Sequence, residues 1–378
     1  MGTGKRITMH YLYYWVVLIA LCSCNGGKTA RQEQAGTAVS ENRREQVKYV
    51  NSLKWITPEK NRSFRFGEEL RVEFENKDRF PIDSSAVYLN GRPVARLDAD
   101  TRTFTLPIPA TRAGRQTLKI VAWHPDNRQG LLSTTIEVKP DKAPVRCSYR
   151  VVNTYPHDPR AYTQGLIYRD GYMYEGTGQC GESSIRKIDM KTGNILSVLT
   201  IDSQFFGEGI TVFKDKIYQL TWRSRKGFVY DLKTFSPESS FSYNTEGWGI
   251  TTVGDRLVMS DGSHKLYHVA PSSFHITKEV EVYDHNGPVE QLNELEYIDG
   301  LVWANVWLSD RIVAIDPESG VVKYELDLTR LLSASERAKL DENDEVLNGI
   351  AWNPEKRTFY LTGKRWPKLF EVQVSLNP

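Results

Sequence analysis

One pattern recurs along the second half of the chain and limits its fold more than any other feature. Each copy is an apolar stretch, a polar turn and a second apolar stretch, and the copies begin at residues 164, 208, 248, 293 and 348. A second hairpin of this kind follows four of the five copies, so the repeating unit has four strands. Four-stranded units about 40–45 residues apart are typical of propeller blades. The sequence therefore predicts an all-β chain with a five-bladed β-propeller over residues 141–378.

The two ends of this repeat array predict how the ring closes. The fifth unit lacks a fourth strand, because its third strand, at residues 368–374, is followed only by the last few residues. An unassigned strand at residues 150–156 precedes the first unit and can complete the last one, which leaves no open sheet edge. The widest gap between copies contains residues 331–340, whose sequence predicts a helical insertion between two blades.

Residues 48–140 have a different pattern of short, alternating stretches. Asn90-Gly91 lies between two of these stretches and is a strong hairpin signal. Roughly seven short strands, ending in a hairpin over residues 114–138, predict an immunoglobulin-like β-sandwich. No cluster of catalytic residue types stands out here, so we interpret this region as a spacer or docking module.

The N-terminal segment, residues 1–24, reads as an export signal. Two basic residues precede an apolar run at residues 11–22, which is too short to span a bilayer comfortably. The run ends in Leu21-Cys22-Ser23-Cys24, which resembles a bacterial lipoprotein signal with Cys24 as the lipidated residue. An ordinary cleaved signal and an uncleaved anchor are the alternatives. The polar residues 25–47 are interpreted as a flexible tether, so we expect an exported monomer, lipid-anchored to a bacterial membrane in the cell envelope.

The net charge and the spacing of the histidines argue against nucleic-acid binding and against a zinc site. The 378 residues carry a net charge of +2, so no basic excess indicates a nucleic-acid partner. His264 and His268 lie four apart on an expected strand, about 13 Å from each other, which is too far to share a zinc ion. We therefore expect neither a catalytic metal nor a cofactor, while a structural ion such as calcium stays open. Cys147 and Cys180, the only cysteines after the signal, either pair or stay free.

Where the repeats differ from one another, chemistry is expected. The start of the first strand and the end of the second lie at one edge of a hairpin, so equivalent positions in all blades ring one mouth of the channel. If these equivalent positions had only a structural role, they should hold the same type of residue in every blade. The alternative is that each side chain merely caps a strand or packs between blades. The set as a whole favours a site made of Gln164, Glu208, Trp222, Trp248, Asn293, Trp307 and Lys364.

These stretches resemble the glutaminyl-peptide cyclotransferase (glutamine cyclotransferase) family of the plant and bacterial type. The resemblance runs in order through residues 149–374 and excludes the sandwich and the signal. Tyr162 stands where the family commonly has Phe, which preserves an aromatic wall. The matching stretches include PHDPRAYTQGL (156–166), FGEGI (206–210), EGWGI (246–250), LNELEYIDGLVWANVW (292–307), VLNGIAW (346–352) and TGKRWPKLFEV (362–372).

The resemblance implies that N-terminal glutamine of a peptide is converted to pyroglutamate with release of ammonia. Glu208 is the only carboxylate in the predicted ring, and it suits a general acid and base that moves a proton from the amine to the leaving nitrogen. Its aromatic neighbours should raise its pKa toward the working pH. Lys364, Asn293 and Gln164 can donate to the oxyanion. The expected walls are Tyr162, Phe206, Trp222, Trp248 and Trp307.

Two other classes of function are compatible with a propeller. A non-catalytic propeller could bind sugars or proteins, and it would tolerate replacement of Glu208. A metal-dependent propeller hydrolase would need several Asp, Glu or Asn side chains around an axial ion, and the predicted ring offers only Glu208 and Asn293.

Overall fold

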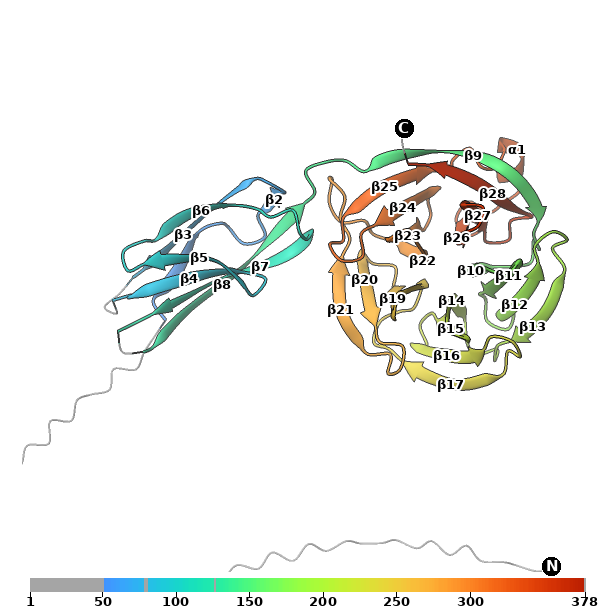
Figure 1. The fold of residues 1–378 in the computed structure, drawn as a ribbon, viewed down its shortest axis with the longest axis horizontal. Helices are drawn as coiled ribbons and strands as arrows, with labels where there is room; N and C mark the ends of the chain where they lie inside the picture. The colour runs from blue at the N-terminus through green and yellow to red at the C-terminus, as the bar shows by residue number, and fades with distance from the viewer. Residues whose placement is uncertain (1–50, 78–80, 126, 377–378) are drawn as a thin grey trace, which may run out of the picture. The chain divides into compact units, whose positions relative to one another are not determined.

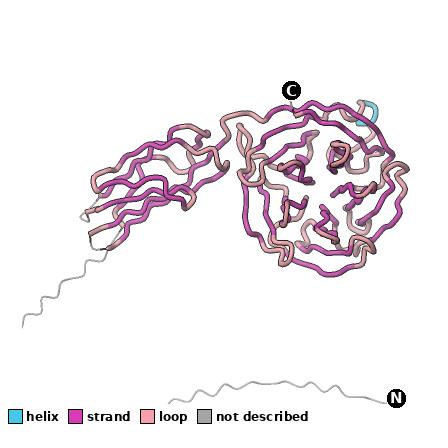
Figure 2. The backbone as a smooth tube through the Cα atoms, viewed as in Figure 1, coloured by secondary structure: helices cyan, strands magenta, loops and turns pink. Residues whose placement is uncertain are grey.

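The computed structural model describes residues 51–77, 81–125 and 127–376. Within these ranges nearly all regular structure is β-strand, as the backbone trace shows (Figure 2), and the only α-helix, α1 (Ala334–Arg337), has four residues. The predicted all-β class is confirmed. No helix of the described ranges is long and apolar enough to cross a membrane.

Residues 51–139 form two facing sheets with an apolar core between them. Alternate residues of β3, such as Leu70, Val72 and Phe74, are buried, which is the period expected of a strand with one face on a core. The predicted turn at Asn90-Gly91 joins β4 to β5, and both residues have positive φ. The closing hairpin is also present, as β7 and β8. One sheet has the order β1 (Leu53–Thr57), β3 (Glu69–Asn76), β6 (Thr103–Pro107), and the other β2 (Ser63–Arg65), β8 (Gln129–Lys139), β7 (Gly114–Trp123), β4 (Ser84–Leu89), β5 (Arg92–Asp98).

The repeats form sheets of four antiparallel strands in chain order. Three such sheets are separate, and they follow one another around a ring in Figure 1, where β10 and β14, the first strands of two of them, lie nearest the axis. Their strands are β10 (Thr163–Arg169), β11 (Tyr172–Thr177), β12 (Ser184–Asp189), β13 (Ile195–Thr200); β14 (Gly207–Phe213), β15 (Lys216–Thr221), β16 (Lys226–Asp231), β17 (Pro237–Ser242); and β18 (Ile250–Val253), β19 (Arg256–Ser260), β20 (Lys265–Val269), β21 (Ile276–Glu281).

The remaining strands of the ring make one eight-stranded sheet. The predicted orphan strand is β9, and its pairing with the last strand, β28, is confirmed. β9 has 12 residues, and its first part also pairs in parallel with β25, which the shorter predicted strand could not reach. The sheet runs β22 (Leu292–Ile298), β23 (Leu301–Val306), β24 (Arg311–Ile315), β25 (Val322–Asp327), β9 (Val145–Pro156), β28 (Lys368–Ser375), β27 (Thr358–Gly363), β26 (Leu347–Asn353).

The predicted helical insertion is shorter than expected. Residues 331–340 were expected to be helical, but α1 covers only Ala334–Arg337. Leu331 and Leu332 are buried in the apolar core before the helix begins, so packing holds them outside it. Ser333 then caps the helix, with Glu336 bonding back to the backbone of the cap residue.

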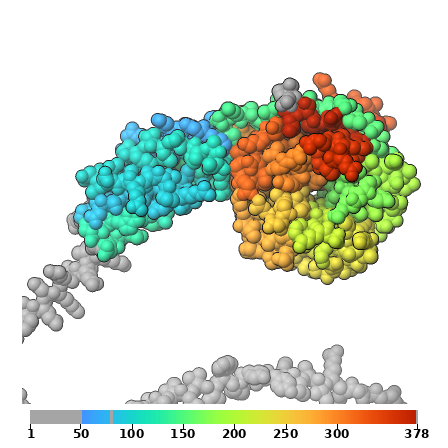
Figure 3. Space-filling model, in the orientation of Figure 1, coloured from blue at the N-terminus to red at the C-terminus, as the bar shows by residue number. Residues whose placement is uncertain are grey.

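Glycines near the starts of the inner strands allow these strands to approach closely. A Cβ on Gly209, which follows Glu208, would lie 2.6 Å from the carbonyl oxygen of Trp248. A Cβ on Gly249, which follows Trp248, would lie 2.0 Å from the carbonyl oxygen of Asn293. These contacts fix the spacing of successive sheets around a centre that is visibly hollowed in the space-filling view (Figure 3). The predicted site positions immediately precede these glycines.

Candidate active site

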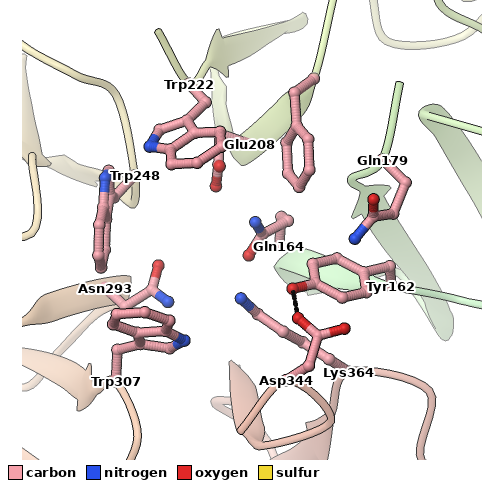
Figure 4. A pocket seen from close by; sticks show the side chains of 11 residues that line it. Tyr162, Gln164, Gln179, Glu208, Trp222, Trp248, Asn293, Trp307, Asp344 and Lys364 are labelled. Carbon is pink, nitrogen blue, oxygen red and sulfur yellow. Dashed lines mark hydrogen bonds between the residues drawn. The ribbon is translucent and has the colours of Figure 1, made fainter. Parts of the chain in front are cut away.

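The nine cavity residues predicted from the sequence line one cavity of about 300 Å³ at the ring's axis. Figure 4 shows polar groups of Gln164, Asn293 and Lys364 directed toward its interior. The predicted lipidation residue, Cys24, lies outside the described residues. The structure brings together Tyr162, Gln164, Phe206, Glu208, Trp222, Trp248, Asn293, Trp307 and Lys364, and it adds Gln179 and Asp344.

Hairpin geometry explains why these residues meet. Gln164, Glu208 and Asn293 are each the second residue of an inner strand, β10, β14 and β22. Trp222 follows the end of β15 and Lys364 the end of β27, which are the antiparallel neighbours of inner strands. Starts of inner strands and ends of their neighbours therefore lie at the same edge of the ring, as the sequence predicted.

Glu208 and Lys364 are both buried, and each is 4% exposed. Burial raises the pKa of the Glu208 carboxyl well above its usual value, and the negative charge of Glu246 adds to this rise while Lys364 opposes it. Burial also lowers the pKa of Lys364, against the effect of Glu208. The predicted direction for Glu208 is confirmed, and burial favours the neutral form of both groups.

Five aromatic side chains form the walls in two contacting groups. In one, the rings of Tyr162 and Phe206 meet edge to face at 5.9 Å, and those of Phe206 and Trp222 at 5.5 Å. In the other, Trp248 and Trp307 are perpendicular at 5.5 Å. The Lys364 ammonium lies 4.7 Å from the Tyr162 ring centroid and 6.0 Å from that of Trp307, so it bridges the two groups.

The two carboxamides of the cavity differ in how far their hydrogen bonds are satisfied. Asn348 Nδ2 donates to Gln164 Oε1 at 3.1 Å and to the carbonyl of Thr163 at 2.9 Å, which fixes the Gln164 amide. Asn293 Oδ1 is buried and has no hydrogen-bond partner within the described part of the chain. Such an atom in an open cavity is available to a ligand donor.

Asp344 and Gln179 were missed from the sequence, and so was the supporting role of Asn348. The Tyr162 hydroxyl donates to Asp344 Oδ1 at 2.5 Å, so the cavity has a second carboxylate beside Glu208, which is the only one in the predicted ring. Asp344 lies in the long connection between β25 and β26, outside the repeat. Gln179 is the second residue after β11, one beyond the position that Trp222 and Lys364 occupy after their strands, so the repeat alignment did not indicate it. Asn348 occupies the inner-strand position of the fifth repeat, and that equivalence was the signal for it.

A carboxylate behind the walls holds two of the indoles. Glu246 Oε2 accepts hydrogen bonds from Trp222 Nε1 at 2.7 Å and from Trp248 Nε1 at 3.1 Å. Arg223 Nε donates to the other oxygen, Oε1, at 3.3 Å. Although partial burial opposes it, these three donors lower the pKa of Glu246, which therefore stays ionised.

Other candidate groups are accounted for by structural contacts. His268 Nε2 bonds to the carbonyl of Pro317, and His264 contacts Glu290 on another segment. His157 lies between Glu175 and the carbonyl of Trp366. Among residues 51–376 that are described, no three His, Cys, Asp or Glu side chains are placed to share a metal ion. Cys147 and Cys180 are both free thiols.

Comparisons with known proteins identify the family of this chain. Residues 128–374 match the family model described as glutamine cyclotransferase. Over 229 residues the chain is 40% identical to a glutaminyl-peptide cyclotransferase of Arabidopsis thaliana, a match that covers 59% of this chain and 70% of that protein. The crystal structure of Myxococcus xanthus glutaminyl cyclase is 32% identical, with a TM-score of 0.58, and 98% of it is matched by 61% of this chain. The chain therefore belongs to the glutamine cyclotransferase family.

Proposed function

We propose that the protein is a glutaminyl-peptide cyclotransferase in which Glu208 acts as both general base and general acid. It converts the N-terminal glutamine of a peptide to pyroglutamate and releases ammonia, in agreement with its family and with the names of both relatives. The observation that carries the catalytic assignment is the buried carboxyl of Glu208 in a cavity that also contains carboxamides and a buried lysine.

The reaction needs proton transfer more than it needs a nucleophile from the protein. The α-amino nitrogen attacks the side-chain carboxamide carbon, a new C–N bond forms, and the original C–N bond breaks to release ammonia. Ionised Glu208 accepts the proton that the attacking nitrogen loses and returns it to the leaving nitrogen. A raised pKa suits this double role, since a carboxyl that titrates near the working pH both accepts and donates readily.

Three donors stabilise the negative charge that develops on the carboxamide oxygen. Lys364, Asn293 and Gln164 carry N–H groups at the cavity, and removing one such donor typically costs about 10²–10³ in rate. The unpartnered Asn293 Oδ1 accepts from the amide nitrogen of the substrate. A side chain without a carboxamide would leave these buried groups unpaired, which gives specificity for glutamine.

The aromatic walls supply the conformational part of catalysis. A cavity of about 300 Å³ is large enough to enclose a folded glutamine residue. Confining the glutamine between indole and phenol rings brings its amine and carboxamide together. The conformational entropy that the peptide must lose to react is therefore already lost on binding.

The finer architecture is part of this proposal. We count the eight-stranded sheet as two blades joined by β9, which makes a five-bladed propeller, residues 141–378, that forms the catalytic domain. Residues 48–140 are assigned as an immunoglobulin-like domain, because two sheets enclose one apolar core and end in a long hairpin.

The cellular setting is also proposed. The segment before the tether supports export and lipidation at Cys24, which would hold a monomeric enzyme on a bacterial membrane in the cell envelope. Residues 25–47 would then act as the flexible spacer between lipid and folded chain.

The direct test is incubation of the purified protein with a glutamine-initiated dipeptide while ammonia release is followed. The matched controls are the same dipeptide with an acetylated amine and one that begins with asparagine. We expect ammonia only from the first peptide, with a product lighter by one ammonia. Binding of the dipeptide without ammonia release would instead favour a non-catalytic binding module.

A further inference from the structure

Glu246 contacts the cavity walls without lining the cavity itself. A single carboxylate oxygen, Oε2, accepts from the indole N–H groups of both Trp222 and Trp248. An indole has only this one hydrogen-bond donor and no acceptor. The rotation of both rings is therefore tied to one atom.

The two indoles belong to different sheets. Trp222 follows β15 in the second four-stranded sheet, whereas Trp248 precedes β18 in the third. Glu246 thus bridges neighbouring blades at the edge where the cavity opens. The guanidinium of Arg223 stacks 3.9 Å from the Trp222 ring centroid and pairs with Glu246, which holds the carboxylate from outside.

The orientation set by Glu246 reaches most of the aromatic wall. Trp222 packs edge to face against Phe206, and Trp248 packs perpendicular to Trp307. The Trp248 ring also lies tightly over Gly262, where an added Cβ would come within 2.6 Å of it. A turn of either indole would consequently displace its aromatic partner as well.

We propose that Glu246 is a positioning residue that locks Trp222 and Trp248 in the orientation that folds the substrate glutamine over Glu208. The inference rests on the proposed cyclotransferase function. Its charge has a second effect, because it contributes to the raised pKa of Glu208. The charged and titratable groups that face Glu208 are Lys364, Glu246, Tyr162, Tyr243 and, across the cavity, Asp344.

Two substitutions separate the hydrogen bonds from the charge. Glu246→Gln keeps an acceptor oxygen for both indoles but removes the negative charge, whereas Glu246→Ala removes both. Glu238→Gln is the matched control, because Glu238 lies on β17 in the same sheet as Glu208 and pairs with Lys216, away from the cavity.

We expect Glu246→Ala to lower kcat/KM for a glutamine dipeptide by about 10–100-fold, mostly through kcat, because the walls no longer hold a reactive conformer. Glu246→Gln should stay within about fivefold of wild type at its own pH optimum. The acidic limb of its pH profile should move to lower pH, since the charge that raises the pKa of Glu208 is gone. Glu238→Gln should change neither rate nor profile.

A second readout does not depend on turnover. In protein labelled with ¹⁵N-tryptophan, the side-chain N–H signals of Trp222 and Trp248 should both shift in Glu246→Ala and return toward their original positions in Glu246→Gln. If the wild type itself released no ammonia, the proposed function would fail while this readout still tested the hydrogen bonds. Unchanged indole signals in Glu246→Ala, or equal loss of activity in the Ala and Gln variants, would overturn the positioning role.

Discussion

At the scale of single residues, the cavity combines two groups, Glu208 and Lys364, whose burial disfavours their charged forms. Burial shifts Glu208 upward and Lys364 downward in pKa, so proton transfer between either group and a bound substrate meets a smaller free-energy difference than in water. The surrounding aromatic rings supply this desolvation and also confine the substrate. One set of side chains therefore serves both the electrostatic and the geometric needs of the reaction.

We predict that Glu208→Gln abolishes cyclisation without loss of stability. Removing a positioned acid–base group should lower kcat/KM by about 10²–10⁴-fold in the ammonia-release assay. Between the unfolded pKa of about 4.3 and the raised folded pKa, the folded state holds a proton that the unfolded state has lost. Stability from this group therefore falls as pH rises through that window, so the neutral variant should melt at the same temperature as wild type or above it at neutral pH. Activity within a few-fold of wild type would contradict the assigned role.

The pH profile of the wild type gives an independent prediction. The general base must be ionised, so kcat/KM should fall as pH decreases through the raised pKa of Glu208, well above the ordinary range of a glutamate. Steady-state measurements over about pH 4–9 on a glutamine dipeptide amide, whose α-amine titrates at a pKa of about 7.7–8.0, would locate this limb beside the titration of the substrate. A limb near pH 4 would show that Glu208 is not the titrating base.

Tyr162→Phe tests the hydrogen bond that the sequence did not indicate. The ring stays over Lys364 and against Phe206, so kcat should remain within about threefold of wild type, but Asp344 loses its donor. We expect a lower melting temperature and a higher KM. Tyr155→Phe, which removes a comparable hydroxyl–carboxylate bond to Glu371 outside the cavity, should lower stability without changing KM. Equal KM values in the two variants would exclude a role for the Asp344 contact in binding.

Most of the site could be predicted because it follows strand register. Gln164, Glu208 and Asn293 occupy one repeated position, so aligning the repeats was enough to bring them together. Asp344 could not be found this way, since it lies in the long connection between β25 and β26. Gln179 was missed because it lies one residue beyond the aligned strand-end position, in the connection between β11 and β12. Hydrogen bonds behind the walls, such as those of Glu246, depend on side-chain orientation, which strand spacing does not specify.

At the scale of elements, the inner strands are held together by backbone contacts that leave no room for a side chain. Such contacts are predictable only in part: the repeated glycine is visible in the sequence, but what it touches is not. The same limit applies to α1, where the helical pattern was visible while the burial of Leu331 and Leu332 that shortens the helix was not.

Gly209→Ala should disturb the site through this packing. The new Cβ would lie 2.6 Å from the Trp248 carbonyl oxygen and 2.8 Å from Gly249 Cα, so backbone must move. We expect a destabilisation of about 1–3 kcal/mol and a rise in KM, because Glu208 and Trp248 flank the displaced atoms. Thermal melting and dipeptide kinetics would measure both. The control is Gly171→Asn, at a turn with positive φ and open space, which should change neither the melting temperature nor KM strongly. A Gly209→Ala variant that behaved like this control would refute the packing argument.

At the scale of the whole molecule, all eleven residues that line the cavity come from position 162 onward. A chain of residues 141–378 should therefore keep wild-type kcat and KM, whereas residues 161–378 lack β9 and should melt far lower or aggregate, since β25 and β28 would both expose edges. Comparing the two by melting and kinetics is decisive. An inactive but folded 141–378 chain would mean that the preceding domain shapes the cavity.

The lipid anchor makes a separate prediction for the intact protein in a bacterial host. Cys24→Ser should release the protein from the membrane fraction with unchanged turnover of a dipeptide, because the cavity and the N-terminal segment share no residue. Cys22→Ser should leave the protein membrane-bound. Equal fractionation of both variants would argue for another kind of signal.

The pairing of β9 with β28 joins the first strand of the ring to the last one made. Val151 lies opposite Val372, so at about 5–20 residues per second the ribosome needs roughly 10–40 s to supply the partner of a strand already synthesised. Throughout that interval β9 has an unsatisfied edge. A transcript cut short or a ribosome that stalls before the final strand yields a chain that cannot hide this edge. Ring closure thus requires the final strand, and we expect chains that lack it to be cleaved by proteases faster than finished molecules.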